Sequence, residues 1–346
     1  MHAPSLYALS EGDLRDLLAG WGEAPYRAGQ IRRWLYERGV ADPGAMTDLS
    51  RALRERLAAQ TRPAALAVAA ERTSRDGTRK RLYRLDDGQL VESVLMPYDD
   101  GRRTACISTQ AGCAMGCVFC ATGQQGFARH LTPGEIFEQA ARFAAELQAE
   151  GERLSNVVLM GMGEPFHNYD AALAAIRRLL GDLGIGARHV TVSTVGLVPQ
   201  IRRFAAEGLQ VRLAISLHAA NDAARAALLP VNKRWPLAEL MGACREYADA
   251  TGRRVTFEWA LIAGKNDDEA TAAELGALLQ GLPAHVNLIP LNPTRGYGGA
   301  PTEAPAAARF VAVLAEHGVP ATVRVRRGID IEAGCGQLRS AVAEPG

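Results

Sequence analysis

The chain has 346 residues, a formal net charge of +1 at pH 7, 48% hydrophobic residues and 22% charged residues. These are ordinary globular values, and they exclude a disordered or collagen-like chain. No apolar run approaches the roughly 20 residues that cross a bilayer, and the first residues lack the basic and apolar stretches of a signal peptide. We therefore expect a cytoplasmic protein with no membrane partner.

The charge balance gives no overall sign of a nucleic-acid partner, because such proteins are usually basic. Only three of the 39 basic residues are lysines (Lys80, Lys233 and Lys265), and the rest are arginines. Arginine binds phosphates and stacks on bases better than lysine does, although a coding bias toward arginine and alanine also explains the excess. Any contact with RNA is then expected to come from local arginine clusters.

Residues 1–64 are predicted to form a small helical domain. Apolar side chains recur at helical spacing in three stretches, and Pro25, Gly39 and Pro43 mark the breaks between them. The recurring positions are Leu14, Leu17 and Leu18, then Ile31, Trp34 and Leu35, then Leu49, Leu53 and Leu57.

Residues 65–104 are predicted to form a β-hairpin extension. Two alternating runs flank Asp87-Gly88, which is a strong hairpin signal. Glu92 lies in the second run, and by itself it reads as an ordinary strand residue that faces solvent.

From residue 105 to 330 strands alternate with helices, which predicts a parallel sheet with right-handed crossovers. The clearest helix covers 131–150, with Thr132 as N-cap, Pro133 in the first turn and Glu135 closing a capping box. The predicted strands are 105–109, 156–160, 189–194, 211–217, 254–261, 286–291 and 321–325. The predicted fold class is thus α/β, a partial (β/α)6 barrel, followed by a C-terminal segment at 331–346.

Three cysteines follow the first barrel strand closely. Cys113, Cys117 and Cys120 are spaced by four and then three residues in a loop that contains glycine. An iron–sulfur cluster held by three thiolates leaves one iron open to an outside ligand. A structural zinc site is the alternative, and it needs a fourth ligand such as Cys106 or His130.

Small polar or charged side chains follow four further strands, at the edge where barrel active sites are built. Each one taken alone has an ordinary explanation, because Ser and Asn often form turns and a lone His is usually a core residue. Together they suit a ligand with ribose, carboxylate or adenine groups. With the glycine and leucine that adjoin them, the candidate residues are Gly163, Glu164, Ser193, Ser216, Leu217, His218 and Asn292.

Three cysteines lie outside the cluster motif. Cys106 is on the first barrel strand, Cys335 lies between two glycines after the last strand, and Cys244 is isolated in a helical region. Free cysteine is most often a small buried hydrophobe, which is the interpretation for Cys244. The flanking glycines of Cys335 argue against simple core packing.

The string CISTQAGCAMGCVFCATGQQGFARHLTPGEI, together with GMGEP, STVG, SLHA, NLIPLNP and GCGQL, resembles the RlmN/Cfr family of radical S-adenosylmethionine (SAM) RNA adenine methyltransferases. The resemblance covers nearly the whole chain and is closer to RlmN than to Cfr. It implies a [4Fe-4S] cluster on Cys113, Cys117 and Cys120, two SAM molecules per turnover, and SAM contacts at the seven strand-end residues named above.

The resemblance also implies the remaining roles. Cys335 carries a methyl group, Glu92 removes the C2 proton, and Cys106 forms a transient disulfide with Cys335. The expected reaction methylates C2 of an adenosine in 23S rRNA and in tRNA next to the anticodon. The expected enzyme is a monomer that receives electrons from a donor such as flavodoxin or ferredoxin.

Two alternatives stay open at this stage. One is methylation at adenine C8, as Cfr performs it with the same parts, and the other is a non-catalytic, zinc-stabilised RNA-binding module. Three basic groups are candidate RNA contacts. They are Arg27, Arg32 and Arg33, then Arg79, Lys80 and Arg81, then Arg324, Arg326 and Arg327.

Overall fold

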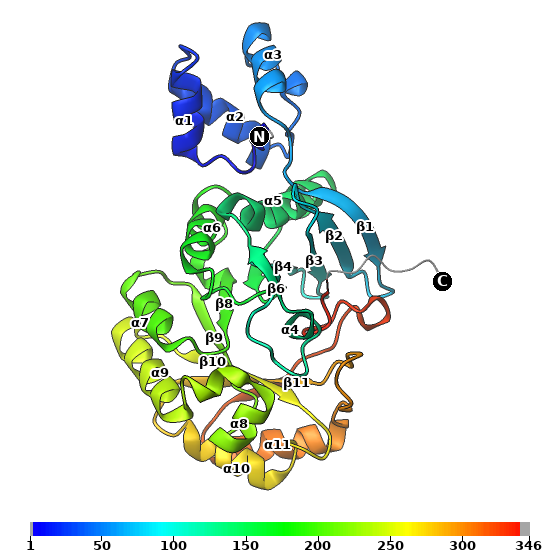
Figure 1. The fold of residues 1–346 in the computed structure, drawn as a ribbon, viewed down its shortest axis with the longest axis vertical. Helices are drawn as coiled ribbons and strands as arrows, with labels where there is room; N and C mark the ends of the chain where they lie inside the picture. Colours follow the sequence, from blue (N-terminus) through cyan, green and yellow to red (C-terminus); the bar gives the residue numbers. More distant parts are fainter. Residues whose placement is uncertain (1–2, 340–346) are drawn as a thin grey trace.

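The computed structural model describes residues 3–339 and places a small helical unit at one end of an open α/β barrel (Figure 1). The unit contains α1 (Glu11–Ala19), α2 (Tyr26–Tyr36) and α3 (Arg51–Gln60), with a 3₁₀ turn at Pro43–Ala45. The predicted apolar positions form its core, with Leu17 only half-buried. The N-terminal region is therefore helical, as its periodicity predicts.

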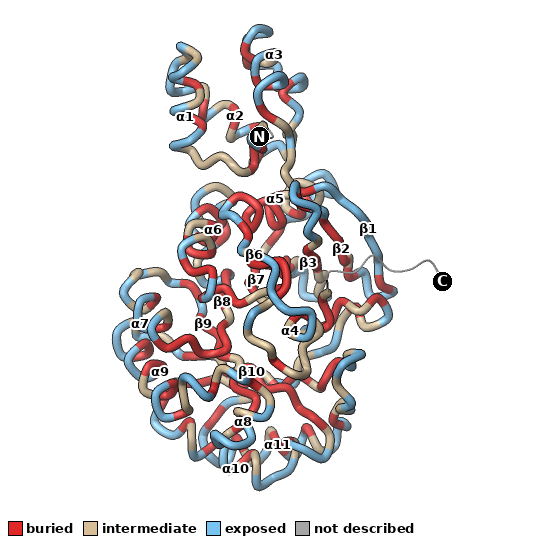
Figure 2. The backbone as a smooth tube through the Cα atoms, in the orientation of Figure 1, coloured by how far each residue is buried: buried red, intermediate tan, exposed pale blue. Residues whose placement is uncertain are grey.

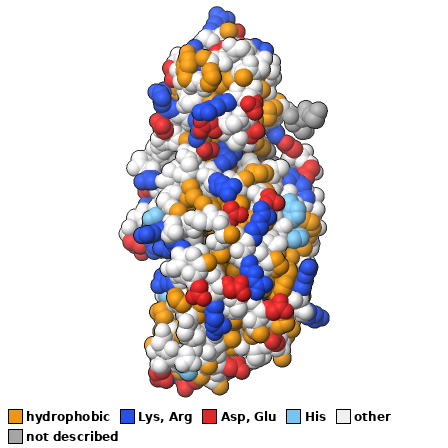
Figure 3. Space-filling model, turned by 90° about the vertical axis from the view of Figure 1, so that its left-hand side faces the viewer, with side chains coloured by type: hydrophobic (Ala, Val, Ile, Leu, Met, Phe, Trp, Pro, Cys, Tyr) orange, Lys and Arg blue, Asp and Glu red, His pale blue; other side chains and the backbone are white. Residues whose placement is uncertain are grey.

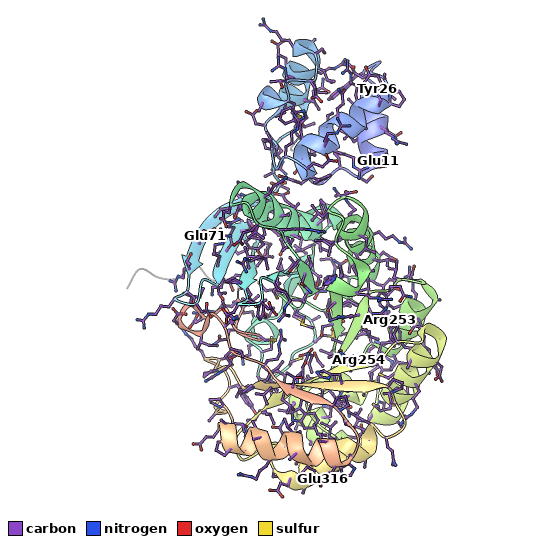
Figure 4. All side chains as sticks on the ribbon, turned by 180° about the vertical axis from the view of Figure 1, so that it is seen from behind. Glu11, Tyr26, Glu71, Arg253, Arg254 and Glu316 are labelled. Carbon is purple, nitrogen blue, oxygen red and sulfur yellow. The ribbon has the colours of Figure 1, made fainter. Side chains whose placement is uncertain are left out.

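The helical unit is docked on the barrel through buried polar contacts. The carboxylate of Glu138 is fully buried and accepts hydrogen bonds from the backbone N–H groups of Ala65 and Leu66 and from the Ser5 hydroxyl. Arg32 pairs with Asp182 at 2.7 Å. Tyr26, which is 62% exposed, lies on the outer surface of the unit, away from the barrel (Figure 4).

A ten-stranded sheet forms the rest of the scaffold, in the order β1-β2-β3-β4-β7-β8-β9-β10-β11-β12. Strands β4 through β12 of this sheet are parallel to one another, and β1 to β3 form an antiparallel edge beside β4. The parallel strands are β4 (Arg103–Cys106), β7 (Asn156–Leu159), β8 (Val190–Thr194), β9 (Arg212–Ser216), β10 (Val255–Leu261), β11 (Ala284–Pro290) and β12 (Ala321–Val323). All seven predicted strands are present, and the predicted α/β class is confirmed.

Helices cover the outer face of the curved sheet, and the buried residues gather between the two layers (Figure 2). Helix α5 begins at the predicted cap, where Thr132 and Glu135 form the capping box and Pro133 occupies the first turn. The helices after the helical unit are α4 (Ala121–Gln125), α5 (Pro133–Ala149), α6 (Tyr169–Gly181), α7 (Val198–Ala206), α8 (Asp222–Leu228), α9 (Leu237–Thr251), α10 (Glu269–Leu278) and α11 (Ala304–Glu316). None of the helices within residues 3–339 is long and apolar enough to cross a membrane.

The antiparallel edge contains the predicted hairpin, β2 (Arg79–Arg84) and β3 (Leu90–Pro97), and an additional strand, β1 (Ala67–Thr73). Gly88 has a φ of +83° in the turn, a conformation that glycine adopts without strain. Lys80 of β2 faces Val94 of β3, which faces Cys106 of β4. Directly opposed residues of antiparallel strands share one face, so these three side chains form a row across the sheet.

The interpretation of Glu92 as a solvent-facing residue is wrong. Strand β3 is covered on both faces, and Glu92 is only 3% exposed. Because side chains alternate along a strand, Glu92 lies on the same face of β3 as Val94 and Met96.

Two irregular segments complete the barrel mouth. The loop after β4 contains a two-stranded sheet, β5 (Gln110–Gly112) and β6 (Phe127–His130). Residues 328–339 include a 3₁₀ turn at Ile329–Ile331 and lie beside the hairpin and α4 (Figure 1). Their backbone is fixed to α4, since Ala121 N–H donates to Gly336 O and the Thr122 hydroxyl donates to Leu338 O. The expected C-terminal segment extends through residues 340–346, which lie outside the described residues.

Candidate active site

A cavity opens at the carboxyl ends of the parallel strands, and together with its open mouth it contains about 1020 Å³ of empty space. It is lined by all three cysteines of the cluster motif, by Cys335, and by residues that follow β7, β8, β9 and β11. Of the seven predicted SAM-contacting residues, Gly163, Glu164, Ser193, Ser216, His218 and Asn292 line this cavity. The side chain of Leu217 is fully buried and does not line it.

The three motif cysteines suit a cluster better than a single metal ion. Within residues 3–339, no three His, Cys, Asp or Glu side chains are arranged to hold one ion. In a [4Fe-4S] cluster each thiolate binds a different iron, whereas a structural zinc needs four ligands around one centre. Burial raises the pKa of Cys113 to about 12 and that of Cys117 well above its ordinary value. Such thiols ionise only when a cationic group lies beside them, and this donor set fits iron.

Glu164 presents a buried carboxylate to the cavity. Its two oxygens accept hydrogen bonds from the backbone N–H groups of Phe166 and Val195, at 2.9 and 2.8 Å. No ion pair joins it to Lys or Arg among the described residues, and burial raises its pKa to about 7. A cationic ligand group such as an ammonium would therefore be favoured here.

Gly163 makes room for this arrangement. It has a φ of +100°, and a Cβ at this position would lie 2.5 Å from the Cβ of Gln110. The Gln110 side chain in turn accepts a hydrogen bond from Glu164 N–H at 2.8 Å. Only glycine fits between the two segments, because both the backbone conformation and the space exclude a side chain.

His218 is a buried, neutral residue of the cavity wall. Its Nδ1 accepts the N–H of Ala260 at 2.9 Å, so the ring proton is assigned to Nε2. Burial lowers its pKa to about 3. Its φ of +61° is unusual for a residue other than glycine, and backbone strain of this kind gathers at functional sites.

Among residues 3–339, two acceptor oxygens of residues that line the cavity have no hydrogen-bond partner. One is Asn292 Oδ1, whose Nδ2 donates to Cys335 O at 3.0 Å. The other is Glu258 Oε2, which is buried and lies 3.6 Å from Arg324. A buried acceptor left unpaired costs about 1–3 kcal/mol, so Asn292 Oδ1 favours a ligand that brings an N–H or O–H donor, whereas Glu258 Oε2 already forms an ion pair with Arg324. With Glu164, Asn292 fits a ligand such as SAM.

A second cavity of about 650 Å³ adjoins the first and is lined by Cys106, Met96, Tyr98 and Arg324, among others. Cys335 lines both cavities, together with Met160, Ile289, Asn292 and Leu338. Its thiol is exposed to the cavity space although protein surrounds it, and burial raises its pKa to about 11. Cys335 therefore stands at the junction between the motif cysteines and Cys106.

All six cysteines are free thiols in the structure. The expected disulfide between Cys106 and Cys335 is therefore not present in this state. Burial raises the pKa of Cys106 to about 12, and the charge of an ionised Cys335 thiol acts in the same direction. The Arg324 guanidinium acts in the opposite direction on both pKa values. Cys244 is fully buried in α9, as expected for a packing residue.

Glu92 lies beside this second cavity without lining it. Its Oε2 accepts the N–H of Arg339 at 2.9 Å, and its Oε1 is 3.2 Å from the Lys80 ammonium. Burial raises its pKa, while Lys80 and Arg339 act to lower it. Leu338, the neighbour of Arg339 in the chain, lines both cavities, so Glu92 is bonded to the residue that follows one of the cavity walls.

Some residues of the site were not predicted from the sequence. Glu258 stands out as the one acid in the apolar strand β10, and that contrast was an available signal. Arg225 is fully buried and donates to the carbonyl oxygens of Val195, Ser216 and Leu217, which fixes two strand ends together. Nothing in the sequence around Arg225 distinguishes it from surface arginines.

The candidate RNA contacts differ in whether their charges are paired inside the protein. Lys80 and Arg81 are buried in ion pairs with Glu92, Glu71 and Glu146, so they do not present surface charge. Arg326 and Arg327 line the second cavity with Arg324, and the Arg327 guanidinium lies 4.6 Å from the Tyr98 ring centre. Figure 3 shows basic side chains following one another down one face with acidic ones between them. The basic surface is thus local rather than continuous.

Comparisons with known proteins agree with this geometry. Residues 107–275 match the Radical SAM superfamily, and residues 5–62 match the Ribosomal RNA large subunit methyltransferase N-terminal domain. Dual-specificity RNA methyltransferase RlmN 1 of Myxococcus xanthus is 54% identical over 341 residues, which are 98% of this chain and 95% of that protein. The chain belongs to the RlmN family of radical SAM RNA methyltransferases.

Other RlmN relatives and a solved structure agree with this assignment. The RlmN of Anaeromyxobacter dehalogenans is 51% identical, covering 97% of this chain and 91% of that protein. The crystal structure of a radical SAM methyltransferase from Sphaerobacter thermophilus has a TM-score of 0.94 and 49% identity, covering 98% of this chain and all of that one. The RlmN family implies a [4Fe-4S] cluster and SAM. The three motif cysteines fit the cluster, and the strand-end residues of the same cavity fit SAM.

Proposed function

We propose that this protein methylates C2 of a specific adenosine in 23S rRNA, and of the adenosine next to the anticodon in tRNA, through a methylated Cys335. The family supplies the reaction class. The observation that carries the proposal is the position of Cys335, whose thiol lines both cavities and thus faces the motif cysteines on one side and Cys106 on the other. A carrier that collects a methyl group in one cavity and delivers it in the next needs this position.

Cys113, Cys117 and Cys120 would hold the cluster, and the SAM contacts would come from the strand ends. Glu164 suits the SAM ammonium, and Ser193, Ser216, His218 and Asn292 offer polar groups around the same cavity. Leu217 would contribute through its backbone, since its side chain points elsewhere. When bound, the reduced cluster supplies the electron that cleaves SAM, and SAM supplies the methyl group and a radical that abstracts hydrogen.

In the first step of the proposed reaction Cys335 would accept a methyl group. It would react as a thiolate, because the thiolate is the nucleophile. Burial opposes ionisation of this thiol, and the Arg324 guanidinium favours it. Arg324 is held in place by Glu258, 3.6 Å away, and by the hydrogen bond from its own N–H to Leu288 O. This supports Arg324 as the cation that assists methylation of Cys335.

Glu92 would accept the proton from C2, and Cys106 would attack the sulfur of Cys335 to release the methylated base. The new bond is the Cys106–Cys335 disulfide. The bond that breaks joins the Cys335 sulfur to the transferred carbon, and its electron pair stays on that carbon, which takes up a proton to become the methyl group. Cys106 lines the same cavity as Cys335, which supports this role. Glu92 Oε2 must first lose the hydrogen bond from Arg339 N–H, and catalytic contacts of this kind often rearrange when substrate binds.

The second cavity supports binding of an unstacked adenine. Enzymes that modify bases take them out of the stack into a pocket with apolar or aromatic walls, and Met96, Tyr98 and Met160 line this one. Arg326 and Arg327 at the same cavity suit phosphates.

We propose 1–64 as an RNA-binding domain, 65–104 as the hairpin extension, 105–330 as the barrel and 331–346 as the carrier segment. From the resemblance alone we also propose a cytoplasmic monomer served by flavodoxin or ferredoxin.

The test is nucleoside mass spectrometry after reaction of the anaerobically reconstituted protein with SAM, a reductant, and either unmodified 23S rRNA or unmodified tRNA. We expect 2-methyladenosine from both RNAs. Formation of 8-methyladenosine, or of no methylated adenosine despite a full complement of iron, would contradict the proposal. A 2-methyladenosine product from one RNA only would limit it to that substrate.

A further inference from the structure

The lysine nearest to the reacting residues has no role in the proposed reaction so far. Lys80 is one of three lysines in the chain, and it is 8% exposed. Burying an ammonium group is costly unless the charge is paired and its hydrogens are bonded. Its partners therefore indicate what the residue does.

Lys80 contacts two segments at once. Its Nζ lies 3.2 Å from Glu92 Oε1 and donates to Glu332 O at 3.1 Å. Glu332 belongs to the segment that carries Cys335, and its φ of +53° marks a tight turn there. The ammonium thus joins the carboxylate of Glu92 to the backbone of the carrier segment.

The strand register makes this contact specific. Lys80 faces Val94 across β2 and β3, and Leu82 faces Glu92, so Lys80 and Glu92 are diagonal neighbours on one sheet face. Val94 faces Cys106 on β4. The ammonium, the carboxylate and the Cys106 thiol therefore lie on the same face, which is also the face on which Met96 lines the second cavity.

The other groups around Glu92 do not replace Lys80. Arg339 donates its backbone N–H to Glu92 Oε2, but its guanidinium pairs with Glu332 at 3.0 Å. Met162 and Ser108 contact only the Glu92 backbone, through the Met162 sulfur and the Ser108 hydroxyl. Glu332 contacts Lys80 through its backbone carbonyl oxygen, and its carboxylate pairs with Arg339. Within the described part of the chain, Lys80 is the cation that forms an ion pair with the Glu92 carboxylate.

We propose that Lys80 is a positioning residue for the proton acceptor, holding Glu92 ionised and oriented beside the segment that carries Cys335. The inference rests on the proposed function, in which Glu92 accepts the C2 proton. A buried carboxylate without a counter-ion takes up a proton and then cannot act as a base. The direction of the shift at Glu92 agrees, since burial raises its pKa and Lys80 lowers it.

The experiment uses the reconstituted enzyme with Cys335 already methylated and follows 2-methyladenosine in a single turnover from about pH 5.5 to about pH 9, a range that spans the titration of a raised carboxyl. The variants are Lys80→Met, Lys80→Gln and Lys80→Arg, with the exposed Lys233→Met as matched control. Gln retains a donor for Glu332 O without the charge, so it separates positive charge from hydrogen bonding.

We expect the acid-side midpoint of the rate to move up by at least about one pH unit in Lys80→Met and Lys80→Gln, which is about tenfold in rate below both midpoints. In Lys80→Arg and Lys233→Met it should stay at the wild-type value. A wild-type midpoint in Lys80→Gln, or an equal shift in Lys80→Arg, would overturn the inference. Iron content and the extent of Cys335 methylation should be unchanged in all four variants, which a general folding defect would not allow.

The two levels of proposal fail in different ways. If the wild-type protein forms no methyl-Cys335 or no 2-methyladenosine, the proposed function fails. If the wild type forms both and the Lys80 variants keep its pH profile, only the role of Lys80 fails.

Discussion

Cys335 and Cys106 line one cavity, although Cys106 is on the first parallel strand and Cys335 lies after the last one. The open barrel brings them together because residues 328–339 return along the antiparallel edge. In the turn between β1 and β2, Asp330 accepts from the Ser74 hydroxyl at 2.5 Å and Asp76 accepts from Gly328 N–H at 2.9 Å. Cys335 alone of the two also faces the motif cysteines. That difference supports the proposed assignment of Cys335 as the carrier and Cys106 as the resolving thiol.

Replacing the carrier should separate cluster assembly from methyl transfer. We expect Cys335→Ala to form no methylated adenosine above background while it retains wild-type iron content and visible absorbance, because Cys335 is not among the three motif cysteines. Nucleoside mass spectrometry and iron analysis measure the two properties. Residual methylation at even about a hundredth of the wild-type rate would rule out an obligatory carrier, since loss of a covalent nucleophile usually costs far more.

Removing the resolving thiol should trap the reaction. In Cys106→Ala the RNA should stay covalently bound to Cys335, because no thiol is left to attack the sulfur–carbon bond. Denaturing gels with labelled RNA detect the adduct, and peptide mass spectrometry locates it. Cys244→Ala is the matched control, since Cys244 is fully buried in α9 and lines neither cavity. The resolving role is untenable if Cys106→Ala releases product as fast as this control.

The Glu164 carboxylate should contribute strongly to SAM affinity. A hydrogen bond to a charged group is worth about 1.5–3 kcal/mol, so Glu164→Gln should raise the Kd for SAM about 10- to 100-fold. Equilibrium dialysis with labelled SAM on the reconstituted protein measures it. Glu316→Gln, on the exposed end of α11 labelled in Figure 4, should leave the Kd unchanged. Equal Kd values for the two variants would remove Glu164 from the SAM site.

Methylation of Cys335 should depend on pH and on Arg324. The Cys335 pKa is raised to about 11, so between about pH 7 and pH 9 the thiolate fraction, and with it the rate, should rise about tenfold per pH unit. Arg324 lowers this pKa, so Arg324→Met should raise it and slow methylation at every pH below it. Intact-protein mass spectrometry follows the reaction, with the exposed Arg309→Met as control. A rate independent of pH, or equal in Arg324→Met and wild type, would contradict this role.

Local features of the fold could be predicted because short-range chemistry determines them. Thr132, Pro133 and Glu135 specify the start of α5, and Asp87-Gly88 specifies the turn between β2 and β3. Strand β1 was not predicted because its residues are mostly exposed and do not alternate in polarity. Strand β1 forms because it pairs with β2. That pairing cannot be predicted from the residues of β1 alone.

The candidate site could also be predicted only where local patterns determine it. The cluster motif and the strand-end residues are local patterns, and six of the seven predicted SAM contacts line the cavity. Glu92 was misjudged because a single carboxylate in a strand usually faces solvent, whereas here the backbone of Arg339 and the ammonium of Lys80 cover it. Lys80 was expected on an RNA-binding surface because it sits in a basic run, and only the strand register reveals its contact with Glu92.

The most direct test of the carrier role follows the methyl group itself. Cys335 is first methylated with SAM that bears a ¹³C methyl group, the excess is removed, and one turnover is run with unlabelled SAM and RNA. If Cys335 is the carrier, the 2-methyladenosine of this first turnover contains the ¹³C carbon. An unlabelled first product, with ¹³C still on Cys335, would show that the methyl group reaches adenine by another route.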